Sequence, residues 1–269
     1  MKFTVLGATG LVGSNLARKL NGLGHDVYAP ARSDFSVFEQ PLGHVIYCIG
    51  LTAEFRSRPF DTVRAHVSVL AKLLERASYD SFLYLSSTRV YSGAERGEET
   101  ALISVSPQNP SDLYNFSKLM GESLCLNCGK ANVRAVRLSN VIGLASASAN
   151  FVFDIASDAL RGHIRLRSDP SSAKDYVAID DVVDLLPKIA TVGNDRLYNL
   201  ASGVKLSHRE LVERLVELTG CTWDNVENAP VVGFPDIDVS RTREEFGFAP
   251  RSVLDYLPGI LSKLKQEIH

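Results

Sequence analysis

Residues 1–13 read MKFTVLGATGLVG, an apolar strand that runs directly into three glycines. The residues that follow, up to Gly24, carry apolar side chains at a helical period, so the glycines stand between a strand and a helix. Glycines in this context typically bind a dinucleotide. Gly7 allows a tight turn, Gly10 lets backbone N–H groups approach a pyrophosphate, and Gly13 allows the helix to pack closely on the strand. The helix N-terminus adds unpaired donors and a partial positive charge. We therefore predict cofactor contacts from Gly7, Thr9, Gly10, Leu11, Val12 and Gly13.

The rest of the chain alternates strand-like apolar runs with amphipathic stretches of helical length, which predicts βαβ units and a parallel sheet. Strands are expected at 26–31, 44–49, 82–86 and 133–138, and helices at 62–77, around Tyr114 and near 253–268. Only residues 33–43 separate the second strand from the third, whereas a βαβ unit takes roughly thirty residues. We predict an α/β, Rossmann-like, doubly wound parallel sheet that lacks one outer strand and leaves the adenine side more open.

The composition is that of an ordinary globular protein, with 45% apolar and 22% charged residues among 269. The net charge of −2 gives no reason to expect nucleic acid or a membrane surface as a partner. No apolar run approaches the about eighteen residues of a membrane helix, and glycines interrupt any secretory signal, so a cytoplasmic protein is expected. Cys125 and Cys128 have no second pair of ligands nearby, so no metal site is predicted.

The end of the second predicted strand indicates which nicotinamide cofactor is preferred. A carboxylate there would accept hydrogen bonds from the ribose 2′-hydroxyl of NAD. Here the stretch reads YAPARS at 28–33, and the first carboxylate is Asp34. Arg32 could pair with a 2′-phosphate, and Ser33 could add a hydroxyl donor. We therefore predict NADP, while Asp34 leaves NAD open.

Tyr114 and Lys118 stand four residues apart in a predicted helix, so their side chains share a face. A positive neighbour lowers the tyrosine pKa from its ordinary value of about 10. Tyr114 could then accept a proton as hydride leaves a carbinol carbon, or donate one in the reverse direction. A pair of this kind can also be a solvated helical pair. Hydroxyls at 86–88 favour the catalytic interpretation, because they follow a central strand, where ligands bind in open α/β sheets.

The combined pattern resembles the extended short-chain dehydrogenase/reductase family, in its NAD-dependent epimerase/dehydratase (nucleotide-sugar) branch. The matching motifs, in order, are GATGLVG at 7–13, LSSTRVY at 85–91, PxxPSDLYNFSK at 107–118, RLSNVIG at 137–143, KDYVAIDDV at 174–182, YNLASG at 198–203 and SRTREEFGFAP at 240–250. The resemblance implies that Ser87 positions the substrate oxygen, Tyr114 transfers the proton, and Lys118 lowers the tyrosine pKa and reaches the nicotinamide ribose. We also expect cofactor contacts from Cys48, Gly50, Tyr114 and Lys118, and substrate contacts from Ser87, Asn140, Lys174 and Arg241.

The departures from the family pattern concern the substrate more than the fold. His66 stands where the family usually has an asparagine, and Lys174 stands where an arginine often faces the nucleotide diphosphate. Thr88 and Arg89 replace the Asp-Glu pair that 4,6-dehydratases place after the catalytic hydroxyl. The acid and base for water elimination are therefore missing, and a dehydratase is not expected.

The resemblance implies a dinucleotide-binding domain of residues 1–144, which also receives 175–200, and a smaller C-terminal substrate lobe of 145–174 and 201–269. We predict an NAD(P)-dependent oxidoreductase that reduces a 4-keto group of a sugar nucleotide. An epimerase with bound NAD is an alternative, and a non-catalytic dinucleotide sensor or scaffold is the alternative of another class. The helices at about 62–77 and 114–129 could form a homodimer contact.

Overall fold

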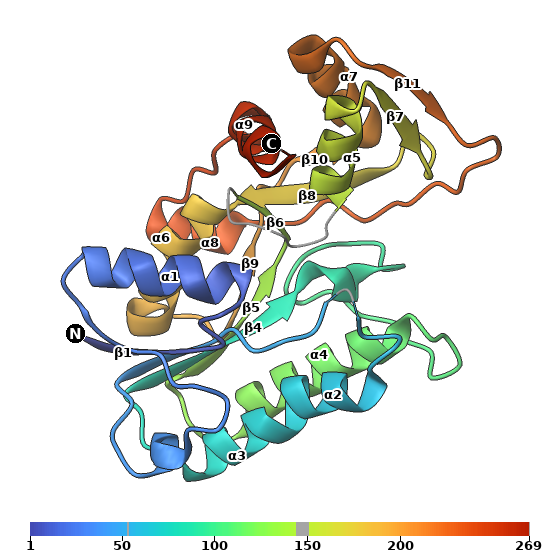
Figure 1. Ribbon diagram of the computed structural model, residues 1–269. Coiled ribbons are helices and arrows are strands. Elements are labelled where there is room, and N and C mark those ends of the chain that lie inside the picture. The colour runs from blue at the N-terminus through green and yellow to red at the C-terminus, as the bar shows by residue number, and fades with distance from the viewer. Residues whose placement is uncertain (53, 144–150, 269) are drawn as a thin grey trace.

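The computed structural model describes residues 1–52, 54–143 and 151–268, and its centre is a six-stranded parallel sheet (Figure 1). The strand order is β2-β1-β3-β4-β5-β9. The bounds are Lys2–Leu6 for β1, Asp26–Tyr28 for β2, His44–Tyr47 for β3, Ser81–Ser87 for β4, Val133–Leu138 for β5 and Leu197–Leu200 for β9. In register, Val5 pairs with Ile46 and Val45 with Phe82. The predicted Rossmann-like parallel fold is confirmed.

Strand β2 forms one edge of this sheet, as the short segment 33–43 predicted. Between β2 and β3 the chain forms only a 3₁₀ turn, η1, at Phe35–Phe38. Asp34 caps this turn, because its carboxylate accepts hydrogen bonds from the Ser36 N–H at 3.0 Å and the Tyr28 hydroxyl at 2.7 Å. The missing outer strand is therefore confirmed, and the more open adenine side stays a prediction.

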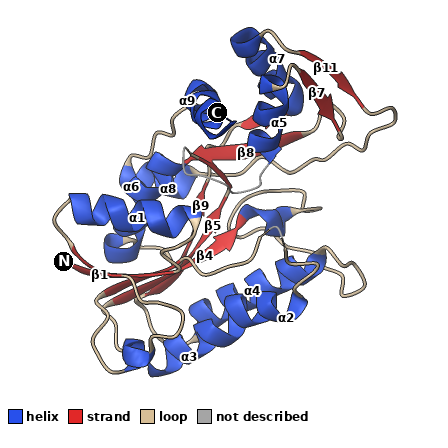
Figure 2. Ribbon diagram, viewed as in Figure 1, coloured by secondary structure: helices blue, strands red, loops and turns tan. Residues whose placement is uncertain are grey.

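Helices cover both faces of the sheet (Figure 2). On one face lie α1, α6 and α8, at Leu11–Gly22, Ile179–Val192 and Ser240–Phe246. On the other lie α2, α3 and α4, at Pro59–Val63, Val69–Arg76 and Asp112–Asn127. Each layer buries apolar side chains against the sheet, such as Leu16 of α1 and Leu70 of α3. This burial is the main contribution that holds the layers together.

The helix predicted at 62–77 begins earlier and is not regular throughout. Pro59 starts it, because a proline at the first helical position loses no hydrogen bond. A π-helical turn, η2 at Arg64–Ser68, then separates α2 from α3. The Tyr47 hydroxyl donates a hydrogen bond to the Ala65 carbonyl inside this turn. A π-helical turn contains one residue more than an α-helical turn. His66 lies within it and is completely buried.

The C-terminal lobe has its own apolar core. It consists of α5 at Phe151–Leu160, α7 at His208–Thr219, α9 at Leu257–Ile268, β7 at His163–Leu166 and β11 at Thr222–Asn225. A three-stranded sheet in the order β10-β8-β6 joins it to the central sheet. These strands span Lys205–Ser207, Ala173–Ala178 and Asn140–Ile142, and the remaining 3₁₀ turns η3 and η4 span Thr88–Tyr91 and Val253–Tyr256.

The structure places one part of the predicted lobe elsewhere. Helix α8 lies within the range 201–269 but packs against β9, and Phe246 and Phe248 join the core of the central sheet. The predicted boundary between residues 144 and 145 lies outside the described residues. Among the residues that are described, no helix has the length and apolar character that spanning a bilayer requires.

Candidate functional site

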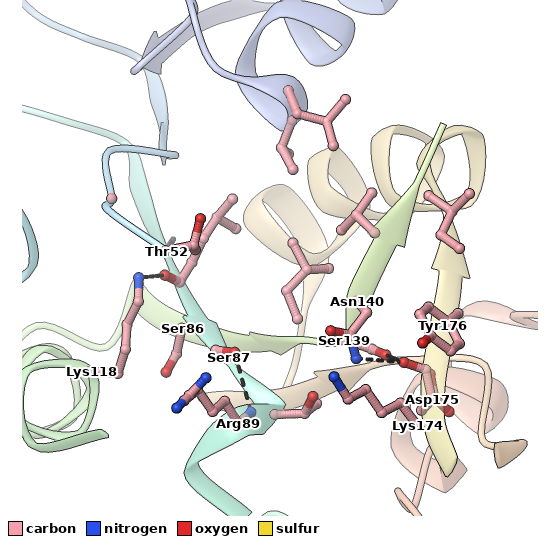
Figure 3. A pocket seen from close by; sticks show the side chains of 18 of the residues that line it. Thr52, Ser86, Ser87, Arg89, Lys118, Ser139, Asn140, Lys174, Asp175 and Tyr176 are labelled. Carbon is pink, nitrogen blue, oxygen red and sulfur yellow. Dashed lines mark hydrogen bonds between the residues drawn. The ribbon is translucent and has the colours of Figure 1, made fainter. Parts of the chain in front are cut away.

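A cavity of about 540 Å³ lies between the C-terminal ends of the central strands and the lobe (Figure 3). Strands β1 and β3 are neighbours there, although β2 separates them in the chain, and ligands of open α/β sheets bind at such a crossover point. The cavity is lined by eleven of the residues that the sequence predicted for the site: Gly10, Leu11, Val12, Gly13, Cys48, Gly50, Ser87, Tyr114, Lys118, Asn140 and Lys174.

Five predicted site residues do not line this cavity: Gly7, Thr9, Arg32, Ser33 and Arg241. Arg32 and Ser33 are exposed, just beyond β2. Arg241 pairs with the carboxylates of Glu99 at 3.5 Å and Asp195 at 3.6 Å. It also donates a hydrogen bond to the Leu197 carbonyl. In the structure Arg241 is therefore paired with groups of the protein itself and does not line the cavity. Its expected contact with a substrate stays a prediction.

The glycine loop has the shape that its spacing predicted. Gly7 has a φ of +85°, and a Cβ there would lie 2.9 Å from the Ile49 nitrogen. A Cβ on Gly13 would lie 2.3 Å from the Gly7 carbonyl oxygen, so only glycine lets α1 approach this closely. Gly10 is the N-cap of α1 and offers no side-chain cap. The first N–H groups of α1 are therefore left to bind a ligand, which suits a pyrophosphate.

Tyr114 is buried in the cavity wall between aromatic side chains. Its ring centroid lies 5.4 Å from that of Phe55 and 5.3 Å from that of His66. Burial raises the pKa of Tyr114, while hydrogen bonding from Ser87 and the charge of Arg89 act in the opposite direction. The expectation was that Lys118 lowers the tyrosine pKa, but here desolvation outweighs both the hydrogen bond from Ser87 and the charge of Arg89.

Lys118 lies beside Tyr114, and its amine lies 5.8 Å from the tyrosine ring centroid. The amine donates a hydrogen bond to the Leu85 carbonyl at 2.9 Å. Burial lowers the pKa of Lys118 to about 7, although Glu122 and Cys48 act to raise it. An amine with this pKa is partly neutral at physiological pH, so small changes around it can change its charge.

Two neighbouring serines at the end of β4 have different roles. The Ser86 hydroxyl donates to the buried carboxylate of Glu122, which also forms an ion pair with Arg137 at 2.8 Å. The Ser87 oxygen accepts a hydrogen bond from the Arg89 N–H at 3.2 Å and lies at the cavity. Of these two serines, Ser87 is therefore the one whose hydroxyl is not held by Glu122, and its contact with a substrate stays a prediction.

His66 takes part in a network that the sequence did not predict. The Leu51 N–H donates to the His66 Nε2 at 3.2 Å, which leaves the proton on Nδ1. Nδ1 lies 2.8 Å from the Ser117 hydroxyl, which in turn donates to the Tyr114 carbonyl. Burial lowers the pKa of His66 to about 2, so the ring is neutral. The departure from the family's asparagine was the only sequence signal for this residue.

The opposite wall of the cavity comes from β6 and β8 (Figure 3). The Asn140 amide donates to the Asp175 carbonyl at 2.8 Å. The Asp175 carboxylate accepts hydrogen bonds from the Ser139 hydroxyl, the Ser202 N–H and hydroxyl, and the Gly203 N–H. Lys174 is half-buried with its amine 5.8 Å from the Phe151 ring centroid. Burial, and next the charge of Arg89, lower the pKa of Lys174.

Comparison with known proteins agrees with this geometry. The sequence pattern of the NAD dependent epimerase/dehydratase family matches residues 3–201. The chain is 30% identical to a dTDP-glucose 4,6-dehydratase from Streptomyces griseus over 200 residues, which are 70% of this chain and 60% of the relative. It is 29% identical to a GDP-6-deoxy-D-mannose reductase from Pseudomonas aeruginosa over 177 residues, 60% of this chain and 56% of that relative. These matches span less than two thirds of each relative's length.

The fold is also that of a solved structure, MoeE5 in complex with UDP-glucose and NAD. The TM-score is 0.82 at 22% sequence identity, and the match covers 100% of both chains. Because the family pattern spans most of the sequence and its motifs meet at one cavity, the chain belongs to the NAD dependent epimerase/dehydratase family.

Proposed function

We propose that the protein is an NAD(P)-dependent oxidoreductase that reduces a 4-keto group of a sugar nucleotide. One observation carries this proposal: Ser87, Tyr114 and Lys118 line the same cavity as the first turn of α1. A proton from Tyr114 and a hydride from a cofactor held by the glycine loop could therefore reach the carbonyl group of one substrate. The reductase and the complex with NAD and UDP-glucose among the similar proteins support this class of reaction.

In this proposal some residues of the cavity bind the cofactor and the substrate, and Tyr114 transfers the proton. The uncapped N–H groups of α1 would bind the pyrophosphate, and the bound cofactor supplies the hydride. Ser87 would hold the substrate oxygen, and Tyr114 would donate the proton as that oxygen gains negative charge. A raised pKa keeps Tyr114 protonated at neutral pH, which suits a proton donor. Lys118 would bind the nicotinamide ribose.

The loop after β2 supports a preference for NADP. The Asp34 carboxylate accepts hydrogen bonds from Tyr28 and Ser36, so it is occupied within its own turn. Arg32 is exposed, and in the part of the chain that the structure describes it forms no ion pair. A free guanidinium beside an occupied carboxylate favours a 2′-phosphate over a 2′-hydroxyl.

The proposed reaction is tested by replacing Tyr114 with phenylalanine. NADPH oxidation is followed with nucleotide-linked 4-keto sugars, both the 6-deoxy and the 6-carboxylate forms, and NADPH binding by nicotinamide fluorescence. Tyr114→Phe should lower kcat by about 10²- to 10⁴-fold with little change in the Kd of NADPH. Tyr256→Phe is the matched control, because this hydroxyl bonds to Asp180 outside the cavity, and it should react as the wild type does.

The same measurements separate the alternatives. Unchanged turnover in Tyr114→Phe would exclude the tyrosine as proton donor. Conversion of a sugar nucleotide to its epimer without net NADPH consumption would favour an epimerase with bound NAD. Cofactor binding without reaction of any substrate would favour the sensor or scaffold.

A further inference from the structure

Arg89 places its guanidinium in the wall of the cavity, beside the ring of Tyr114. The residue belongs to the 3₁₀ turn η3, directly after Ser87 and Thr88, and it lines the cavity. Its guanidinium carbon lies 5.6 Å from the ring centroid of Tyr114 and 5.0 Å from that of Phe55. Figure 3 shows it on the same side of the cavity as Ser87. A ligand group held by Arg89 would therefore lie close to the carbon on which Tyr114 acts.

This guanidinium forms no direct ion pair within the part of the chain that the structure describes. Among residues 1–52, 54–143 and 151–268, Arg89 forms no ion pair, and its buried Nε donates no hydrogen bond. The other buried arginine near the site, Arg137, is paired with Glu122. A half-buried cation without a partner costs free energy, since the aromatic contacts replace only part of its hydration. Burial and next the charge of Arg56 lower the pKa of Arg89, while Tyr114 and the more distant Asp112 carboxylate act to raise it without a direct contact.

The other charged groups of the cavity do not balance Arg89. Asp175 is the only carboxylate among the described lining residues, and four hydrogen bonds from Ser139, Ser202 and Gly203 already satisfy it. Lys118 bonds to the Leu85 carbonyl beside the expected nicotinamide position. Lys174 lies on the opposite wall, where a diphosphate is expected. Among the cations that line the cavity in the described residues, Arg89 is thus the one to which no anion or acceptor has been assigned.

We infer that Arg89 binds a carboxylate carried by the sugar ring, so that the substrate is a sugar nucleotide of the uronic acid type. A guanidinium can hold a carboxylate through two parallel hydrogen bonds, which fixes the orientation of the ring as well as adding affinity. Because Arg89 lies beside the Tyr114 ring, we take this carboxylate to be carried by the ring carbon next to the reacting one. The inference rests on the proposed function, because it takes the cavity to hold a sugar nucleotide.

The test compares sugar nucleotides that differ only at C6. UDP-glucuronate is paired with UDP-glucose, and GDP-mannuronate with GDP-mannose, and each Kd is measured by calorimetry on the NADP-saturated protein. In at least one pair the wild type should bind the uronate about ten- to a hundredfold more tightly, as expected for a hydrogen bond between charged groups. Arg89→Gln should bring the two affinities of that pair together, and Arg89→Lys should keep part of the difference.

Arg56→Gln is the matched control. Its guanidinium also lies against Phe55, at 4.5 Å, but Arg56 bonds to Ser111 and does not line the cavity. This variant should keep the full preference for the uronate. Retained NADPH binding in every variant shows that the fold is intact.

Equal affinities within both pairs in the wild type would overturn the inference, as would a preference that survives in Arg89→Gln. Binding of NADPH without binding of any of the four sugar nucleotides would also overturn it. A loss of kcat in Arg89→Gln with a shifted pH profile and unchanged affinities would show that Arg89 influences the Tyr114 hydroxyl and does not bind a carboxylate of the substrate. The readout is binding, so a uronate preference without turnover would leave the inference standing while the proposed reaction fails.

Discussion

At the scale of single residues, the charge of Lys118 is expected to change with pH near neutrality. Burial lowers its pKa to about 7, whereas the unfolded chain has the ordinary lysine value of about 10.4. Between these values the unfolded state binds more protons than the folded state. The contribution of Lys118 to the free energy of unfolding therefore rises with pH in this window, by up to about 1.4 kcal/mol per pH unit.

Lys118→Met tests this linkage, because methionine keeps most of the side-chain volume and cannot be charged. Denaturant unfolding of both proteins is measured at several values between pH 6 and pH 9. The free energy of unfolding of the wild type should increase relative to that of the variant as the pH rises above about 7. Parallel pH dependences in the two proteins would show that the buried amine does not titrate in this range.

The residues that the sequence could predict are those whose role follows from nearby positions. Tyr114 and Lys118 were predicted from a helical spacing of four, and Ser87 from the family motif at a strand end, and the cavity brings all three together. Arg241 was chosen for its charge and its family position alone. Its partners Glu99 and Asp195 are distant in sequence, so no local pattern could show that Arg241 was already paired.

At the scale of elements, the junction of β1 and α1 depends on the absence of a side chain at Gly13. A Cβ there would lie 2.3 Å from the Gly7 carbonyl oxygen, which is backbone and cannot rotate away. Gly13→Ala should therefore displace the start of α1 and weaken NADPH binding at least tenfold, and lower the melting temperature by several degrees. Fluorescence titration and thermal unfolding measure the two effects.

Gly22→Ala is the control within the same helix. A Cβ at Gly22 would meet no atom within 4 Å, so the substitution should leave NADPH binding unchanged. It should raise stability slightly, because alanine favours a helix by up to about 1 kcal/mol over glycine. Equal effects of the two substitutions would contradict the packing role of Gly13.

Hydrophobic patterns predicted the elements of the sheet better than the irregular turns between them. The strand at 133–138 appears with its predicted bounds, since buried parallel strands form continuous apolar runs. The π-helical turn at Arg64–Ser68 was not predicted, because one extra residue barely changes the spacing of apolar side chains. Its cause lies in tertiary contacts of Tyr47 and His66, which no local window contains.

At the scale of the whole molecule, two neighbouring helices expose apolar side chains. Phe60 and Val63 are exposed on α2, and Phe116 and Met120 on α4, with Phe60 82% and Met120 53% accessible. The spacings of three and four residues put each pair on one face of its helix. Helices α2 and α4 pack together against the same face of the sheet (Figure 1). We propose that this surface is the homodimer contact expected from the sequence.

Met120→Glu tests the contact, because a charge at the centre of an apolar interface between identical chains would be buried twice. Light scattering after size-exclusion chromatography should give the mass of a dimer for the wild type and of a monomer for the variant. Leu102→Glu is the control, since Leu102 is 94% exposed but lies in the loop before α4 and belongs to neither helix. This variant should remain dimeric. A wild type that is monomeric at micromolar concentration, or a Met120→Glu variant that stays dimeric, would show that the exposed faces of α2 and α4 do not associate.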